Sequence, residues 1–316
     1  MAAEQAPLIV LTGPTGIGKS ALALALAERF GGEILVADSR QVYRELDIGT
    51  AKPTPAERAR VPHHLLDLVP PDAPFSVADY QAAAEAALAD VARRGRLPLL
   101  VGGTLHYIQA VVDRLALPRV PPQPALRTEL EALARREGPA ALVERLRRLD
   151  PEAAARIDPH NVRRLIRALE VIAATGQPFS VVGRRRGPAR PALHLALTAP
   201  RAELYARIDA RVHAMLAAGW LEEVARLLAR YDPALPSLSG IGYRELAQVV
   251  RGELALAEAV PLICHRTHAF ARRQYTWARR DPRLEWFAIG PGLEERVATR
   301  VAQYLAERGG ARAWTS

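Results

Sequence analysis

The sequence has 316 residues, of which 49% are hydrophobic and 24% are charged, and its formal net charge is +9. A chain of this length and apolar content can bury a core without cross-links, and its single cysteine, Cys264, excludes both a disulfide framework and a multi-cysteine zinc site. The longest apolar runs fall short of the roughly 20 residues that a membrane-spanning helix needs, and the run at residues 8–11 lacks the basic residues and cleavage site of a signal peptide. We therefore expect a cytoplasmic protein with no membrane partner.

The first part of the chain alternates between patterns typical of strands and of helices. Strands are expected at residues 8–11, 33–37, 65–68 and 97–101, and helices at residues 20–29 and 78–94. Because such alternation is typical of a parallel sheet covered by helices, we predict that residues 1–120 form the first part of an α/β core.

The next part of the chain is helical and rich in arginine. Residues 121–176 contain no strand pattern, and clusters of proline and glycine lie on both sides of them. We predict an inserted all-helical subdomain at residues 121–190. Between Arg119 and Arg190 there are 15 arginines and 8 acidic residues. This concentration indicates a nucleic-acid contact surface, although a general preference for arginine would also raise the charge.

Residues 191–316 are expected to return to the core. A strand at residues 193–197 is followed by helices at 202–217, 221–230, 243–250 and 262–278, a short strand at 284–288 and a last helix ending near residue 308.

A phosphate-binding loop is predicted directly after the first strand and before the first helix. The sequence GPTGIGKS at residues 13–20 fits the pattern G-x-x-x-x-G-K-[ST]. Backbone N–H groups and the helix N-terminus of such a loop bind a diphosphate, the lysine neutralises the outer phosphate, and the hydroxyl of the last residue ligates Mg²⁺. Diphosphate-binding residues are therefore expected to be Gly13, Pro14, Thr15, Gly16, Ile17, Gly18, Lys19 and Ser20, with Ser20 as the metal ligand.

The position of the nearby carboxylate is unusual for an ATPase. An ordinary P-loop ATPase has a second apolar strand that ends in an aspartate, whereas the strand at residues 97–101 runs into Gly102, Gly103 and Thr104. The strand at residues 33–37 does end at Asp38. This arrangement weakens the interpretation as a nucleotide hydrolase but leaves a small-molecule kinase open.

Several further strings resemble the tRNA dimethylallyltransferases, also called tRNA isopentenyltransferases, of the compact bacterial type. They are the phosphate-binding loop, DSRQVY at residues 38–43, DIGTAKP at 47–53, PHHL at 62–65, GGTLHY at 102–107, RRLIRALE at 163–170, GIGYR at 240–244 and RRQYTW at 272–277. They occur in the family's order and cover residues 7–290. The resemblance implies a P-loop NTPase-like parallel sheet flanked by helices, with the all-α insertion.

The resemblance also implies an activity. Such an enzyme transfers a dimethylallyl group from dimethylallyl diphosphate to N6 of the adenosine 3′-adjacent to the anticodon in tRNA, and it releases diphosphate. By resemblance, Lys19, Arg211 and Thr104 act at the leaving diphosphate, and Asp38 is the candidate general base. Asp38 has the alternative roles of a magnesium ligand or a helix N-cap, and Arg211 and Arg207 those of solvated helix arginines.

The acceptor adenine must be flipped into the active site. By resemblance, the residues that contact the anticodon stem-loop are Asp38, Ser39, Arg40, Gln41, Thr104, Arg127, Arg163, Arg164, Leu165, Ile166, Arg167, Ser239, Gly240, Ile241, Gly242, Tyr243, Arg244, Arg272, Arg273, Gln274, Tyr275, Trp277 and Arg279. Arg163, Arg164 and Arg167 share one helical face, which suits a phosphate backbone. Tyr275 and Trp277 have core packing as the alternative.

The sequence leaves three other functions open. An adenylate isopentenyltransferase would share the phosphate-binding loop but would not need an arginine-rich insertion. A P-loop kinase for a small metabolite would turn over ATP without a prenyl donor. An RNA-binding P-loop protein that uses a nucleotide only as a switch would not need Asp38 and Thr104. We expect a monomer, and the role of Lys52 is not explained by its sequence context.

Overall fold

The structure is a computed structural model that describes residues 7–308. It divides into two compact units, which are described separately. Of the described residues, the first unit contains 7–76, 80–112 and 190–308, and the second contains 113–189 together with 77–79.

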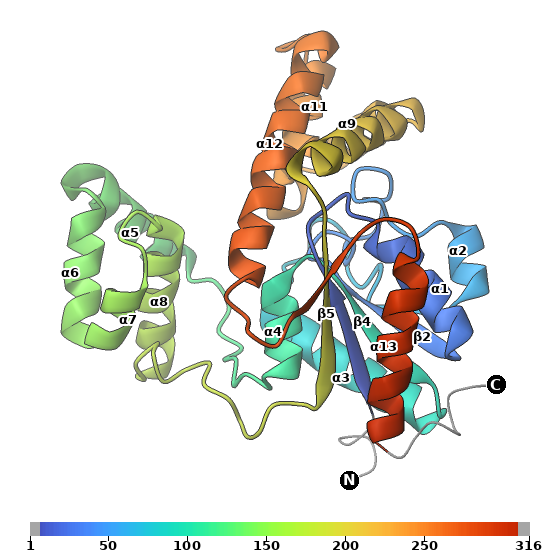
Figure 1. Ribbon diagram of the computed structural model, residues 1–316. Helices are drawn as coiled ribbons and strands as arrows, with labels where there is room; N and C mark the ends of the chain where they lie inside the picture. Colours follow the sequence, from blue (N-terminus) through green and yellow to red (C-terminus); the bar gives the residue numbers. More distant parts are fainter. Residues whose placement is uncertain (1–6, 309–316) are drawn as a thin grey trace. The chain divides into compact units, whose positions relative to one another are not determined.

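The first unit is built on a six-stranded sheet in which every pair of neighbouring strands is parallel. The strand order is β3-β2-β4-β1-β5-β6, so β1 lies between β4 and β5 (Figure 1). All residues of β1, β2 and β4 are buried, because helices cover both faces of this part of the sheet. The strands are β1 (Leu8–Thr12), β2 (Gly32–Ala37), β3 (His63–His64), β4 (Leu97–Gly102), β5 (Ala192–Thr198) and β6 (Glu285–Ala288).

Helices pack on the two faces of this sheet. On one face, α1 (Lys19–Arg29) and α13 (Leu293–Glu307) bury leucine, alanine and valine side chains against β1, β4 and β5. On the other face lie α3 (Val77–Arg93) and α4 (Leu105–Val112), where the rings of Tyr80 and Tyr107 stack at 3.9 Å. Tyr80 also donates a hydrogen bond to the carbonyl of Val36. The sheet is therefore enclosed on both sides, and ligand access is left to the ends of its strands.

Apart from α2, the remaining helices of this unit lie between β5 and β6 in the sequence. They are α2 (Pro55–Arg60), α9 (Arg201–Ala217), α10 (Trp220–Leu228), the 3₁₀ turn η2 (Pro236–Ser239), α11 (Tyr243–Val250) and α12 (Leu256–Ala278). The helix expected at residues 262–278 begins six residues earlier and contains Pro261 in its second turn.

The second unit is helical. It consists of α5 (Pro124–Glu137), α6 (Pro139–Leu149), α7 (Pro151–Arg156) and α8 (Val162–Thr175) around their own apolar core. Asp150 and Asn161 cap α7 and α8 by accepting backbone N–H groups, and Gly176 ends α8 in the left-handed conformation. This unit begins at residue 113, eight residues before the boundary expected from the sequence.

One expected strand is wrong. Residues 65–68 do not form a strand, and β3 contains only His63 and His64. Leu65 and Asp67 have φ angles of 68° and 56°, which no strand accommodates. The chain turns here because the Asp67 carboxylate forms ion pairs with Lys52 and Arg58. Among residues 7–308, no helix is both long and apolar enough to cross a membrane.

Candidate active site

The loop of residues 13–20 lies between β1 and α1 and curls as a phosphate-binding loop does. Gly13, Gly16 and Gly18 have φ angles of 142°, 80° and 101°. A Cβ atom on Gly16 would lie 2.8 Å from Cγ1 of Ile208, so helix α9 packs directly on the loop. The loop therefore requires glycine at these positions, because other residues rarely adopt such positive φ angles. At Gly16, a side chain would also collide with Ile208 of α9.

Lys19 closes this loop from within. Its ammonium group donates hydrogen bonds to the carbonyls of Gly13 at 2.9 Å and Pro14 at 2.8 Å. Burial, reinforced by the nearby positive charge of Arg211, lowers the pKa of Lys19 to about 7, although Asp38 acts in the opposite direction. Burial and a second cation thus both act against the charged form of Lys19 in the absence of an anion.

Arg211 approaches the same loop from α9. Its guanidinium donates a 2.5 Å hydrogen bond to the hydroxyl of Thr15, while its Nε atom is buried without a hydrogen-bond partner among the described residues. Burial lowers the pKa of Arg211. Arg207, one turn away, is half exposed and has only a 3.9 Å ion pair with Glu203 and a 3.4 Å hydrogen bond to the carbonyl of Gly16. The two arginines therefore differ in exposure: Arg207 is exposed, whereas Arg211 is more buried.

Asp38 and Thr104 meet because their strands are neighbours. Ala37 at the end of β2 pairs with Gly102 at the end of β4, which places the two following segments side by side. The hydroxyl of Thr104 accepts the backbone N–H of Ser39 at 3.0 Å. One carboxylate oxygen of Asp38 accepts the N–H of Arg40 at 2.8 Å, which fixes the side chain.

These groups line a single pocket of about 420 Å³. Each expected stretch of the first unit contributes between one and four residues to this pocket. Its polar lining contains Thr15, Lys19, Ser20, Asp38, Ser39, Arg40, Gln41, Thr104, Arg211, Ser239, Tyr243, Arg273 and Gln274, and its apolar lining includes Val36, Val101, Val212, Met215, Ile241 and Phe270.

Comparison with known proteins assigns this architecture to a family. The family model described as IPP transferase matches residues 41–281, and the model described as isopentenyl transferase matches residues 6–67. The chain belongs to the IPP transferase family. Its fold and its enzyme class, prenyl transfer, follow from this membership.

The relatives cover almost the whole chain. A tRNA dimethylallyltransferase from a Roseiflexus species is 54% identical over 301 residues, covering 95% of this chain and 99% of the relative. The one from Moorella thermoacetica is 50% identical over 308 residues, covering 95% of each chain. The crystal structure of a tRNA isopentenylpyrophosphate transferase from Bacillus halodurans is 37% identical, with a TM-score of 0.71 and coverage of 96% of this chain and 98% of the other. A eukaryotic dimethylallyltransferase acting on tRNA is 25% identical, with a TM-score of 0.73 and coverage of 96% and 77%.

The DIGTAKP string of this IPP transferase forms a loop that walls the pocket. The carboxylate of Glu223, buried on α10, accepts the backbone N–H groups of Asp47, Ile48 and Gly49 at 3.0, 2.7 and 3.2 Å. A Cβ atom on Gly49 would lie 2.0 Å from the indole nitrogen of Trp220, so the loop packs tightly against α10. Glu223 therefore stabilises the site, and nothing in its sequence context predicted this role.

The structure gives Lys52 a role. Its ammonium group is buried and donates to the carbonyl of Tyr43 at 2.9 Å and to the carboxylates of Asp47 and Asp67 at 2.6 and 2.7 Å. A compact ammonium can serve three acceptors converging from different segments, which a planar guanidinium cannot. Both lysines of the chain therefore lie around the same pocket.

Gln274 connects α12 to the phosphate-binding loop. Its side-chain oxygen accepts the N–H of Thr15 at 2.9 Å, and its side-chain nitrogen donates to the carbonyl of Gly103 at 3.0 Å. We expected Gln274 to contact tRNA, but its side chain is buried and its amide is used within the protein. It positions the loop, and it also lines the pocket.

Other side chains expected at the RNA interface are held by the protein. Tyr275 packs against the main core, and its hydroxyl accepts the N–H of Ala199, so the core-packing alternative holds for this residue. Gln41 donates to the carbonyls of Thr50 and Ala51. The Tyr243 hydroxyl donates to Glu223, and the Arg40 guanidinium donates to the carbonyls of Pro236 and Ser237.

The other side chains expected at the RNA interface of this unit include exposed ones on α11, on α12 and at the end of α12. Trp277 of α12 is 39% exposed. The arginines Arg272, Arg273, Arg279 and, on α11, Arg244 are exposed as well. The guanidinium of Arg279 lies 5.7 Å from the ring centre of Tyr275. Ser39, Gly240, Ile241 and Gly242 are at least partly buried.

In the helical unit, the expected RNA-contacting residues fall into three groups. Leu165 and Ile166 are buried in its core, so their side chains stabilise the unit and are withdrawn from solvent. Arg127 and Arg167 pair with the fully buried carboxylate of Glu170. Arg163 and Arg164 are exposed, and neither side chain has a hydrogen bond or ion pair within residues 7–308.

Proposed function

We propose that this chain transfers a dimethylallyl group from dimethylallyl diphosphate to N6 of the adenosine 3′-adjacent to the anticodon in tRNA, giving N6-isopentenyladenosine and diphosphate. One observation carries the proposal. The pocket that contains the phosphate-binding loop also contains Asp38, and the buried Nε of Arg211 beside that loop has no acceptor among the described residues. A buried donor without a partner costs free energy, and an anionic ligand would supply the missing acceptor.

Departure of diphosphate is the first chemical demand on the site. As the bond from C1 to the bridging oxygen breaks, its electron pair goes to the diphosphate, where negative charge increases. Lys19, Arg211 and the loop N–H groups are fixed donors near that charge, and such preorganised donors stabilise the transition state. Lys19 would exchange its two carbonyl acceptors for phosphate oxygens, and Thr104 lines the same pocket as Lys19 and Asp38.

The second demand is removal of a proton. The N6 amine of adenine is a poor nucleophile, so a base must accept its proton as the new bond to C1 forms. Asp38 lines the pocket and is held by the N–H of Arg40, which leaves its other oxygen for the amine. The phosphate-binding loop follows β1 and Asp38 follows β2, and β4 lies between these two parallel strands, so the leaving group and the base are at the same edge of the sheet.

Magnesium would bind at the diphosphate. Among residues 7–308, no group of three or more His, Cys, Asp or Glu side chains is placed to hold a metal ion. The exposed hydroxyl of Ser20 and the carboxylate of Asp38 both line the pocket, and hard oxygen ligands of this kind together with phosphate oxygens suit Mg²⁺. When bound, the ion would offset the charge of the diphosphate.

The acceptor comes from a flipped nucleotide of the anticodon stem-loop. The exposed cations Arg244, Arg273 and Arg163 suit the RNA backbone, and the chain's net charge of +9 favours a polyanionic partner. We also propose that the enzyme acts as a monomer.

Mass spectrometry of an unmodified tRNA after incubation with dimethylallyl diphosphate and Mg²⁺ tests the proposal. The tRNA should gain one dimethylallyl group at a single adenosine, and AMP under the same conditions should remain unmodified. Prenylation of AMP with an unmodified tRNA would indicate an adenylate isopentenyltransferase, and ATP turnover without a prenyl donor would indicate a kinase.

A further inference from the structure

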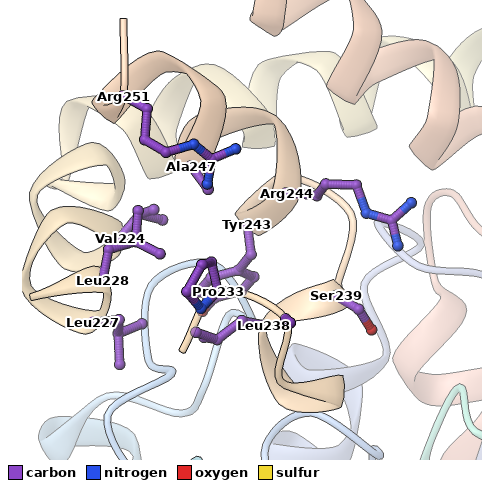
Figure 2. A pocket seen from close by; sticks show the side chains of 11 residues that line it. Val224, Leu227, Leu228, Pro233, Leu238, Ser239, Tyr243, Arg244, Ala247 and Arg251 are labelled. Atoms are coloured by element: carbon purple, nitrogen blue, oxygen red, sulfur yellow. The ribbon is translucent and has the colours of Figure 1, made fainter. Parts of the chain in front are cut away.

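A second, smaller pocket lies outside the site described above. It has a volume of about 210 Å³ and lies between α10, the segment of residues 233–239 and α11 (Figure 2). Its lining residues are Val224, Leu227, Leu228, Pro233, Ala234, Leu238, Ser239, Tyr243, Arg244, Ala247 and Arg251.

The size and lining of this pocket restrict what it can hold. Sites for drug-sized ligands and cofactors have about 300–1,000 Å³, so a volume of about 210 Å³ fits a single small ring system. Val224, Leu227 and Leu228 form an apolar wall along α10, with Pro233 and Leu238 beside them (Figure 2). Apolar side chains of this kind can pack against the face of an unstacked nucleobase.

The charge at its edge is positive and not neutralised. Arg244 is exposed, and its guanidinium has no hydrogen bond or ion pair with any residue in the described part of the chain. Arg251 is paired with Glu253, at 2.6 and 2.9 Å, so Arg244 supplies the uncompensated charge. A base attached to a phosphate would place its apolar face on α10 and its charge near this arginine.

The pocket adjoins the active site without belonging to it. Ser239 and Tyr243 line both pockets, whereas neither the phosphate-binding loop nor Asp38 lines the smaller one. Arg40, which lines the active-site pocket, fixes the segment that borders both pockets. Its guanidinium donates to the carbonyl of Ser237 at 3.0 Å and to the hydroxyl of Ser239 at 3.3 Å. The pocket is therefore placed for a group next to the acceptor and not for the prenyl donor.

We propose that this pocket binds one unpaired base of the tRNA loop, from a nucleotide beside the acceptor adenosine. This inference depends on the proposed function. Flipping the acceptor breaks its stacking on its neighbours, and single-stranded RNA is recognised by splaying bases onto such protein surfaces. The apolar wall of α10 gives the neighbouring base a new surface while Arg244 contacts its phosphate.

The test fills the pocket from its exposed edge. Ala234→Phe places a ring in the pocket without disturbing the core, because Ala234 is exposed and lines it. Ala229→Phe is the matched control, since Ala229 is exposed at the end of α10 and does not line the pocket. Burial of about 40 Å² of apolar surface contributes about 1 kcal/mol, so Ala234→Phe should weaken binding of a synthetic anticodon stem-loop about fivefold or more. The control, the affinity for inorganic diphosphate and the melting temperature should not change.

Stem-loops that lack one base identify the nucleotide. With wild-type protein, removal of the base that occupies the pocket should weaken binding, and on that stem-loop Ala234→Phe should cause no further weakening. An equal effect of Ala234→Phe on every stem-loop, or no effect on any, overturns the inference.

Photo-crosslinking supplies a measurement that does not depend on a variant. Stem-loops with 4-thiouridine at each position around the acceptor are irradiated with wild-type protein, and the linked peptide is sequenced. A link within residues 224–238 supports the inference, and links confined to other segments contradict it. If the stem-loop is never prenylated, the proposed function fails; if it is prenylated normally by Ala234→Phe, only this inference fails.

Discussion

Arg211 and Thr15 join helix α9 to the phosphate-binding loop through a 2.5 Å hydrogen bond from the guanidinium to the threonine hydroxyl. The bond holds a buried cation over the loop, and the free Nε of the same guanidinium lacks an acceptor among the described residues. This unsatisfied group costs folding free energy in the absence of a ligand and gains an acceptor when diphosphate binds.

Arg211→Gln is expected to lower the rate of prenyl transfer about 10²–10³-fold, the scale for loss of one preorganised donor. The melting temperature should stay the same or rise, because a desolvated and incompletely paired cation is removed. Single-turnover transfer and thermal melting measure both effects. Arg207→Gln, one turn away on an exposed side chain, should have a much smaller effect on transfer.

The lowered pKa of Lys19 predicts that diphosphate binding depends on pH. Its pKa in the free protein is about 7, and a bound anion raises this pKa because it favours the charged form. Below pH 7 the lysine is already protonated, so its contribution to affinity should be constant. Above pH 7 binding requires uptake of a proton, and the contribution should fall by up to about tenfold per pH unit. Calorimetry with inorganic diphosphate measures this.

Lys19→Ala is the reference for that experiment, because the ligand's own ionisation affects both proteins equally. The ratio of wild-type to variant affinity should decline above pH 7. A ratio that does not change between pH 6 and 9 would contradict the role given to Lys19.

Asp38→Asn tests the general base. The variant keeps an oxygen that can accept the N–H of Arg40, so the loop should retain its conformation. Prenyl transfer is expected to fall about 10²–10⁴-fold, while the affinity for inorganic diphosphate stays within about twofold. Unchanged transfer would show that Asp38 does not accept the proton, even though the family assignment would stand.

Glu223→Ala is expected to destabilise the pocket wall. It removes the acceptor of three backbone N–H groups and of the Tyr243 hydroxyl, all in a buried environment. The free energy of unfolding should fall by about 3 kcal/mol or more, which urea denaturation measures. Its neighbour Glu222 is exposed, and Glu222→Ala should change stability by about 0.5 kcal/mol at most.

Arg163→Ala tests whether the helical unit binds RNA. It should weaken tRNA binding and reduce the slope of log affinity against log salt concentration by about one unit, because one phosphate is no longer neutralised. Arg167→Ala should reduce the slope too and also lower stability, because Arg167 bonds to Glu170 and to the carbonyl of Val120. The exposed Arg156, paired with Glu152, gives a control; a wild-type slope for Arg163→Ala would contradict the predicted interaction with phosphate.

Local sequence patterns determined most of the secondary structure. The phosphate-binding loop, five of the six strands and the helical character of residues 121–176 are encoded by residues near one another in the chain, through periodicity, glycine positions and the GKS end of the loop. The third strand was missed because its ending depends on ion pairs from Asp67 to Lys52 and Arg58, which come from other segments.

The tertiary structure decided which side chains remain free for a ligand. Gln274 and Thr15 are 259 positions apart, and the run RRQYTWAR is equally suited in sequence to RNA contact and to packing. Its buried face turns Gln274 toward the loop and Tyr275 into the core, whereas Trp277 stays exposed. Periodicity defines a helix and its faces, but which face is covered depends on the elements that pack against it. The sequence therefore determined the phosphate-binding loop and its lysine, and only packing determined that Arg211 would be buried above them.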